Sequence, residues 1–92
     1  MSHEYLITSS APLEIITKWS SIVLQDFGIK LISTDSGAYS EQNEQGWPTV
    51  SIFFDPPQHF SFNISPSLCE EILQNISAFI ESDGWQFKWE EA

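Results

Sequence analysis

The chain has 92 residues, 41% of them hydrophobic and 14% aromatic, which fits one folded domain over residues 1–92 and excludes a disordered chain. Thirteen Asp and Glu residues face three lysines and no arginine, and this formal net charge of −10 makes nucleic acid and anionic lipid poor direct partners. The single cysteine excludes an intramolecular disulfide and a cysteine-based metal site.

The first third of the chain predicts a strand, a helix and a second strand. Residues 4–8 are a short apolar run, and Ser10 after them can cap a helix. From residue 13 to residue 26, polar side chains recur every three or four positions, which predicts an amphipathic helix that ends at Gly28. We expect its apolar face to be core, and that face comprises Ile15, Ile16, Trp19, Ile22 and Val23. Residues 29–33 are then predicted to form a strand.

A polar, acidic segment, residues 34–47, follows this strand, and residues 38–40 extend the strand or belong to the connection. Connections this long in a small domain are often functional. Aromatic and acidic side chains together are typical of protein-binding patches, in which the rings supply buried area and the charges supply steering. The candidate residues are Asp35, Tyr39, Glu41, Glu44 and Trp47. The alternative is a solvated loop from which Trp47 packs into the core.

Residues 50–64 predict a β-hairpin whose apolar side chains share one face. With residues 55–59 as the turn, the resulting register places all six on the same side of the sheet, and a shift by one residue loses this agreement because side chains alternate faces along a strand. The expected pairs are Phe54 with Phe60, Ile52 with Phe62, and Val50 with Ile64.

The other residues of this hairpin suggest no chemistry. Pro56 and Pro57 belong in the turn because proline donates no ladder hydrogen bond. His59 is expected in the same loop, with no second histidine nearby. Phe53 points to the opposite face, where either a helix end covers it or it is exposed to a partner.

The last third predicts a helix and a strand. The helix begins either at residues 65–66 or at a capping box of Ser67 with Glu70, and Gly84 ends it. Cys69 lies on its apolar face and is expected to be a buried, inert thiol. The apolar positions with helical spacing also include Leu68, Ile72, Leu73, Ile76, Phe79 and Ile80. Alternating aromatic and polar residues from residue 85 onward predict a half-buried strand with an acidic tail.

The predicted order is therefore β-α-β-β-β-α-β. Two helices on one face of a largely antiparallel sheet make an α+β sandwich, which can be a variant of the ferredoxin-like arrangement.

No catalytic template is complete in this sequence. His3, His59 and Cys69 do not form a metal-ligand set, and no nucleophile motif or glycine-rich phosphate loop is present. The absence of arginine also removes the commonest bidentate ligand of phosphate and carboxylate substrates. We predict no catalytic, cofactor-binding or metal-binding residues and a protein that is not an enzyme.

In size, charge and aromatic content the whole chain resembles the small acidic immunity proteins of bacteria, including those of contact-dependent growth inhibition and of nuclease colicins. The resemblance rests on overall character and transfers no individual residue. It implies a basic partner in the cytoplasm, a nuclease toxin whose active site or an adjoining surface is covered. Nucleases are basic because their substrate is a polyanion, so an acidic inhibitor competes on the same electrostatic terms.

The expected partner surface is the acidic aromatic loop, with Asp55, Glu90 and Glu91 as a secondary acidic rim. Two other functions stay open: a phage-type inhibitor that mimics nucleic acid and blocks a defence enzyme, and an acidic adaptor subunit of a larger assembly. The charge can also serve solubility alone. With neither a signal peptide nor a membrane span in the sequence, we expect a cytoplasmic protein.

Overall fold

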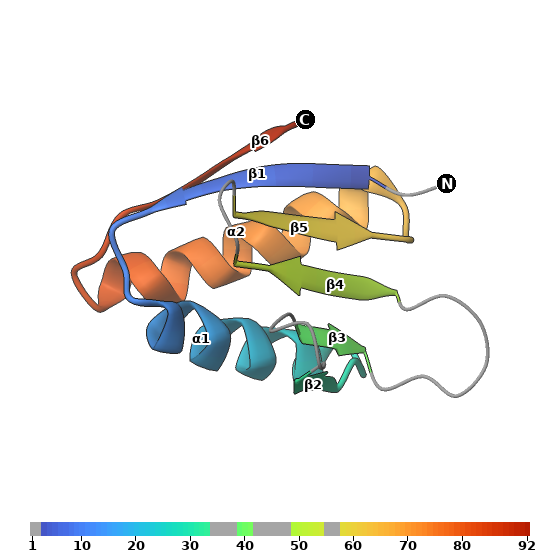
Figure 1. Cartoon of the computed structure of the whole chain (residues 1–92), viewed down its shortest axis with the longest axis horizontal. Coiled ribbons are helices and arrows are strands. Elements are labelled where there is room, and N and C mark those ends of the chain that lie inside the picture. Colours follow the sequence, from blue (N-terminus) through green and yellow to red (C-terminus); the bar gives the residue numbers. More distant parts are fainter. Residues whose placement is uncertain (1–2, 34–38, 42–48, 55–57) are drawn as a thin grey trace.

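Two helices pack on one face of a six-stranded antiparallel sheet (Figure 1). The structure is a computed structural model that describes residues 3–33, 39–41, 49–54 and 58–92. In chain order the elements are β1 (His3–Ser9), α1 (Leu13–Asp26), β2 (Leu31–Ser33), β3 (Tyr39–Glu41), β4 (Val50–Phe53), β5 (His59–Phe62), α2 (Pro66–Ser82) and β6 (Phe87–Glu91).

The strands lie in the order β2-β3-β4-β5-β1-β6, so the first strand sits between the fifth and the last. This arrangement confirms the predicted α+β class with two helices on a largely antiparallel sheet. The structure adds one strand to the predicted order, because residues 39–41 pair antiparallel with β2 instead of extending it. The second predicted strand is shorter than expected and begins at Leu31.

The β4–β5 hairpin has the predicted faces but a different register. Val50 pairs with Phe62 and Ile52 with Phe60, two positions away from the expected pairs. A shift of two residues leaves every side chain on the same face, so the six apolar side chains still point toward the helices or the edge of the core. His59 is consequently the first residue of β5, and the prediction that it lies in the loop is wrong.

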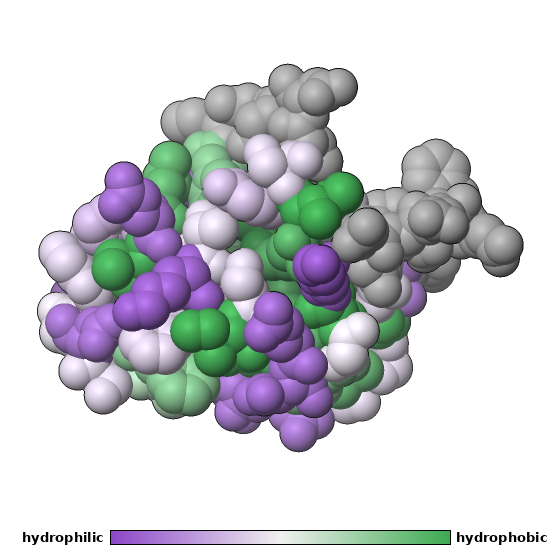
Figure 2. Space-filling view, turned by 90° about the horizontal axis from the view of Figure 1, so that it is seen from below, coloured by the Kyte–Doolittle hydropathy of each residue, from purple (hydrophilic) through white to green (hydrophobic). Residues whose placement is uncertain are grey.

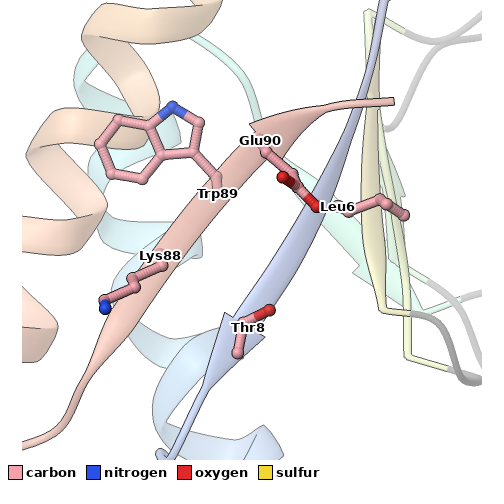
Figure 3. Close-up of a pocket in the computed structure, with 5 residues that line it drawn as sticks. All are labelled: Leu6, Thr8, Lys88, Trp89 and Glu90. Atoms are coloured by element: carbon pink, nitrogen blue, oxygen red, sulfur yellow. The ribbon is translucent and has the colours of Figure 1, made fainter.

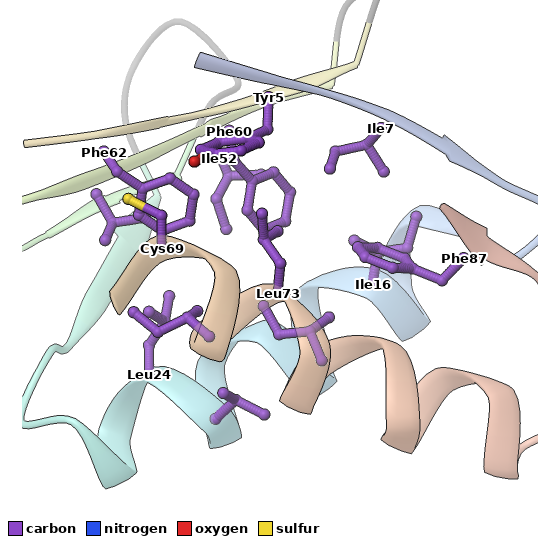
Figure 4. Close-up of a cluster of buried hydrophobic side chains, with 14 of the residues drawn as sticks. Tyr5, Ile7, Ile16, Leu24, Ile52, Phe60, Phe62, Cys69, Leu73 and Phe87 are labelled. Carbon is purple, nitrogen blue, oxygen red and sulfur yellow. The ribbon is translucent and has the colours of Figure 1, made fainter. Parts of the chain in front are cut away.

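The core lies between the sheet and the helices (Figure 4). Phe62 is fully buried, and the Tyr5 ring meets it edge-on with 5.9 Å between centroids. The other fully buried large side chains are Phe60, Phe87, Ile16, Leu24, Ile52, Ile72, Leu73, Ile76, Ile80, Val23 and Val50.

The buried stripe of α1 is rotated from the predicted face and comprises Ile16, Ser20, Val23 and Leu24. Leu24 is fully buried, whereas Ile22 is 39% exposed. These two residues lie about 200° apart around a helix, so only one of them can face the sheet. The structure therefore corrects the prediction that Ile22 is core.

The serines near the helix starts do not cap the helices with their side chains, although the sequence had suggested that they would. Among the described residues no side chain caps α1 or α2, and the Ser10 hydroxyl instead accepts a 2.8 Å hydrogen bond from the backbone N–H of Gln86. This bond ties the β1–α1 turn to the chain entering β6. As predicted, a glycine terminates each helix: Gly28 and Gly84 lie two residues beyond the ends of α1 and α2, and their φ angles of 78° and 90° favour glycine.

Candidate protein-binding surfaces

The acidic aromatic loop falls largely outside the described residues. Asp35, Glu44, Trp47 and Asp55 all lie there, so their predicted role in partner binding stays a prediction. Glu41 is described as the last residue of β3. The structure describes the surroundings of the remaining three candidates, Tyr39, Glu90 and Glu91.

Tyr39 packs against the core from β3. It pairs with Ile52, its side chain is half-buried, and its ring meets the Phe54 ring edge-on with 5.8 Å between centroids. Its position supports a structural contribution, and only part of the side chain is open to a partner. Anchoring by Tyr39 stays a prediction.

The segments that carry the other loop candidates leave β3 from opposite ends. Ser33 pairs with Tyr39, so residues 34–38 connect these two paired positions, while residues 42–48 follow Glu41 at the other end of the strand. Figure 1 shows β3 between β2 and β4. The candidates are therefore divided by a strand instead of belonging to one continuous loop.

Glu90 and Glu91 lie on opposite faces of β6. Glu90 is opposite Leu6 on the face without helices, and Glu91 is opposite Tyr5 on the helix side. Burial raises the pKa of Tyr5, and the charges of Cys69, Glu91 and Glu70 raise it further. The two carboxylates are both exposed but do not share one face, so they do not form a single rim.

The sheet face without helices carries an exposed aromatic ring. Phe53, His59, Leu6 and Glu90 form a row across β4, β5, β1 and β6. The Phe53 ring stacks on His59 with 4.6 Å between centroids and remains 36% exposed. The expectation that a helix end covers Phe53 is wrong, because both helices lie on the other face.

At the end of this row formed by Leu6 and Glu90, β1 and β6 form an open hollow of about 270 Å³ (Figure 3). It is lined by Leu6, Thr8, Lys88, Trp89 and Glu90. Lys88 and Glu90 bring opposite charges to it, and the Trp89 ring lies on the other side of β6 from the Glu90 side chain. Oppositely charged and apolar groups here suit a protein side chain as well as a small molecule, so the hollow by itself does not define a ligand.

The helix side has an aromatic pair that joins the two helices. The Trp19 ring of α1 stacks on the Phe79 ring of α2, with 4.7 Å between centroids and 5° between planes. Trp19 Nε1 donates a 2.7 Å hydrogen bond to Asp83 Oδ2, and Lys18 Nζ lies 4.8 Å from the centroid of the Trp19 ring. We expected both rings in the core, yet Phe79 is 40% exposed and Trp19 only half-buried.

Charge is concentrated on this helix side. Residues 13–26 and 66–83 carry six exposed carboxylates and one lysine, a formal charge of −5. The acidic residues are Glu14, Asp26, Glu70, Glu71, Glu81 and Asp83. From below the orientation of Figure 1, where α1 lies nearest, hydrophobic side chains sit among strongly hydrophilic ones (Figure 2).

The metal-ligating and thiol groups of the described residues do not gather into one metal site. Within them no group of three His, Cys, Asp or Glu residues could hold a metal ion. Cys69 is fully buried, burial raises the pKa of its thiol, and its Sγ lies 3.8 Å from the Ile64 carbonyl oxygen that accepts its weak hydrogen bond. Such a thiol is a poor nucleophile. None of the helices in the described part of the chain is long and apolar enough to cross a membrane.

The architecture is an α+β sandwich, and in the part of the chain that the structure describes an acidic helix side contrasts with a nearly neutral sheet face. Comparison with known proteins adds no family to this description: no family model, curated protein or solved structure matches the chain.

Proposed function

We propose that this protein is an inhibitor that binds a basic protein, and specifically an immunity protein that neutralises a nuclease toxin by covering its active site or an adjoining surface. The observation that carries the proposal is the net charge of −10 on a small folded domain that also exposes aromatic rings. Long-range attraction speeds the capture of a basic protein, and aromatic side chains supply contact area after the encounter.

The same charge explains competition with the toxin's substrate. A nuclease surface that attracts a polyanion also attracts an array of carboxylates, and six of these are exposed on the helix side. Inhibition therefore requires no catalysis by the acidic partner. It requires only that binding keeps nucleic acid out of the active site.

The test starts from the product of the gene adjacent to the one that encodes this chain. Its toxin domain is purified, and its nuclease activity is titrated with this protein. We expect activity to disappear at an equimolar ratio and growth of cells that express the toxin to recover when both proteins are present.

Full nuclease activity in a large excess of this protein, with no growth rescue, would contradict the proposal. Inhibition of a DNA-binding defence enzyme without any effect on the adjacent gene product would instead favour nucleic-acid mimicry. An unrelated acidic protein of similar charge serves as the control for nonspecific inhibition.

A further inference from the structure

An apolar strip runs across the outer side of the helix pair. Ile22 lies one turn beyond Trp19 on α1, and Trp19 stacks on Phe79 of α2. Ile22 is 39% exposed and Phe79 is 40% exposed. We call these three residues the helix-side strip. Exposed large apolar side chains grouped in this way are typical of protein contact sites.

The helix-side strip is held in place by contacts within the protein. Trp19 packs on the core with part of its surface, and its indole N–H is bound to the Asp83 carboxylate at 2.7 Å. The Lys18 ammonium group lies over the Trp19 ring, with Nζ 4.8 Å from the ring centroid. A fixed ring needs little ordering on binding, which lowers the entropic cost of association.

The surrounding charge decides which kind of partner fits. The two helices and Asp83 carry a formal charge of −5, whereas the described residues facing outward on the helix-free sheet face carry Glu4, Glu90 and Lys88, a net of −1. Among the described residues, the helix side exposes Phe79 and Ile22, and the sheet face exposes Phe53 and Ile32, which are 36% and 42% exposed. These two pairs are alike in apolar character, whereas the charges around them differ, so a basic partner is attracted more strongly to the helix side.

We propose that the helix-side strip is the docking surface for the basic partner. An apolar side chain of the partner packs on Phe79 and Ile22, and lysines or arginines beside it face the carboxylates of α1 and α2. This inference rests on the proposed function and names its contact face. A second copy of this chain is a poor occupant, since each copy carries a charge of −10.

The probe for this surface is a synthetic amphipathic helix of leucine and lysine, titrated into ¹⁵N-labelled protein and followed by NMR. We expect the largest shifts at the Trp19 indole N–H and at the amides of Ile22 and Phe79. Shifts centred on Phe53 and Leu6, or no binding to the unmodified protein, would overturn the proposal.

Two matched double variants then test affinity. Ile22→Gln with Phe79→Gln removes the exposed apolar groups of the helix side without changing charge, and Ile32→Gln with Phe53→Gln does the same on the sheet face. We expect about a tenfold loss of affinity for the first pair and no measurable change for the second. Equal losses, a larger loss for the sheet pair, or no loss in either overturns the proposal.

The unmodified protein and the two double variants are then tested against the toxin domain encoded by the adjacent gene, with thermal melts to confirm that each is folded. If the toxin is inhibited and only the sheet pair weakens binding, the helix-side strip is wrong and the proposed function stands. If the toxin is not inhibited, the proposed function fails, and the peptide titration still decides whether the helix side binds a basic amphipathic segment.

Discussion

The Trp19 ring lies flat against the Phe79 ring, with 4.7 Å between centroids and 5° between planes, and so links the outer sides of α1 and α2. The hydrogen bond from Trp19 Nε1 to Asp83 adds a second link between residues 64 positions apart in sequence. Because the side chains are partly exposed, this pair contributes to folding and also presents a surface to other molecules.

Phe79→Ala removes the stack and should lower the free energy of unfolding by about 1 kcal/mol, since aromatic pairs contribute roughly 0.5–1.5 kcal/mol. Urea unfolding measures the change. Gln74→Ala, at an exposed position of the same helix, is the control and should have little effect. Identical unfolding curves for all three proteins would show that the stack contributes nothing.

Phe62→Ala should cost about 3–5 kcal/mol because a fully buried ring is replaced by a cavity. Phe53→Ala removes the same group from the exposed sheet face and should cost less than about 1.5 kcal/mol. Chemical denaturation of both variants measures the difference. A larger cost at Phe53 would mean that the two faces of the hairpin are assigned the wrong way round.

Ser20→Ala should stabilise the protein by about 1–2 kcal/mol. The Ser20 hydroxyl is buried and has no hydrogen-bond partner in the described part of the chain, and alanine is also the better helix former. Ser21→Ala, at the half-buried neighbouring position, should gain only about 0.5 kcal/mol from helix propensity. Thermal unfolding separates the two effects, and a destabilised Ser20→Ala protein would reveal a bond to the hydroxyl.

Stability should decline at alkaline pH because the folded state holds two protons more tightly. Burial, chiefly, raises the pKa of both Cys69 and Tyr5, so the unfolded chain loses these protons first as pH rises. The stability that the Cys69 thiol contributes is complete below the ordinary thiol pKa of about 8.5. It is lost as the pH rises from there through the raised pKa of the folded protein.

The Cys69→Ala protein measures this contribution. Its stability relative to the unmodified protein should be constant at lower pH and should improve only above about pH 8.5. The remaining decline should begin near the ordinary tyrosine pKa of about 10. A stability difference that is the same at all pH values would show that the thiol does not titrate differently in the folded state.

The fold class could be predicted from the sequence because periodicity identifies which face of each element is apolar. The hairpin register could not, since alternation repeats every two residues and cannot distinguish pairing of Ile52 with Phe60 from pairing with Phe62. The turn decides between these registers. Likewise, the apolar spacing predicted Ile22 and not Leu24 on the core face of α1, whereas the packed sheet buries Leu24 and leaves Ile22 39% exposed.

The candidate site was harder to predict than the fold. Composition indicates an acidic surface with aromatic rings. Because Asp35 and Glu44 lie close along the chain, the sequence places this surface in the loop of residues 34–47. Trp19 and Asp83 come together only through the packing of two distant helices. Patterns of nearby residues cannot predict a contact between Trp19 and Asp83. The helical spacing of Trp19 predicts a core residue, although its ring is partly exposed.

The proposed capture of a basic protein by this acidic domain is tested most directly by measuring how fast the two proteins associate at increasing salt, with the product of the adjacent gene as the proposed toxin partner. We predict that the association rate falls by about tenfold or more from low to high ionic strength, while the dissociation rate changes little. Glu70→Lys with Glu71→Lys should weaken this salt dependence more than Glu41→Lys with Glu44→Lys if the helix side leads the encounter. An association rate that is the same at low and high salt, or no association at all, would contradict electrostatic capture of a basic partner.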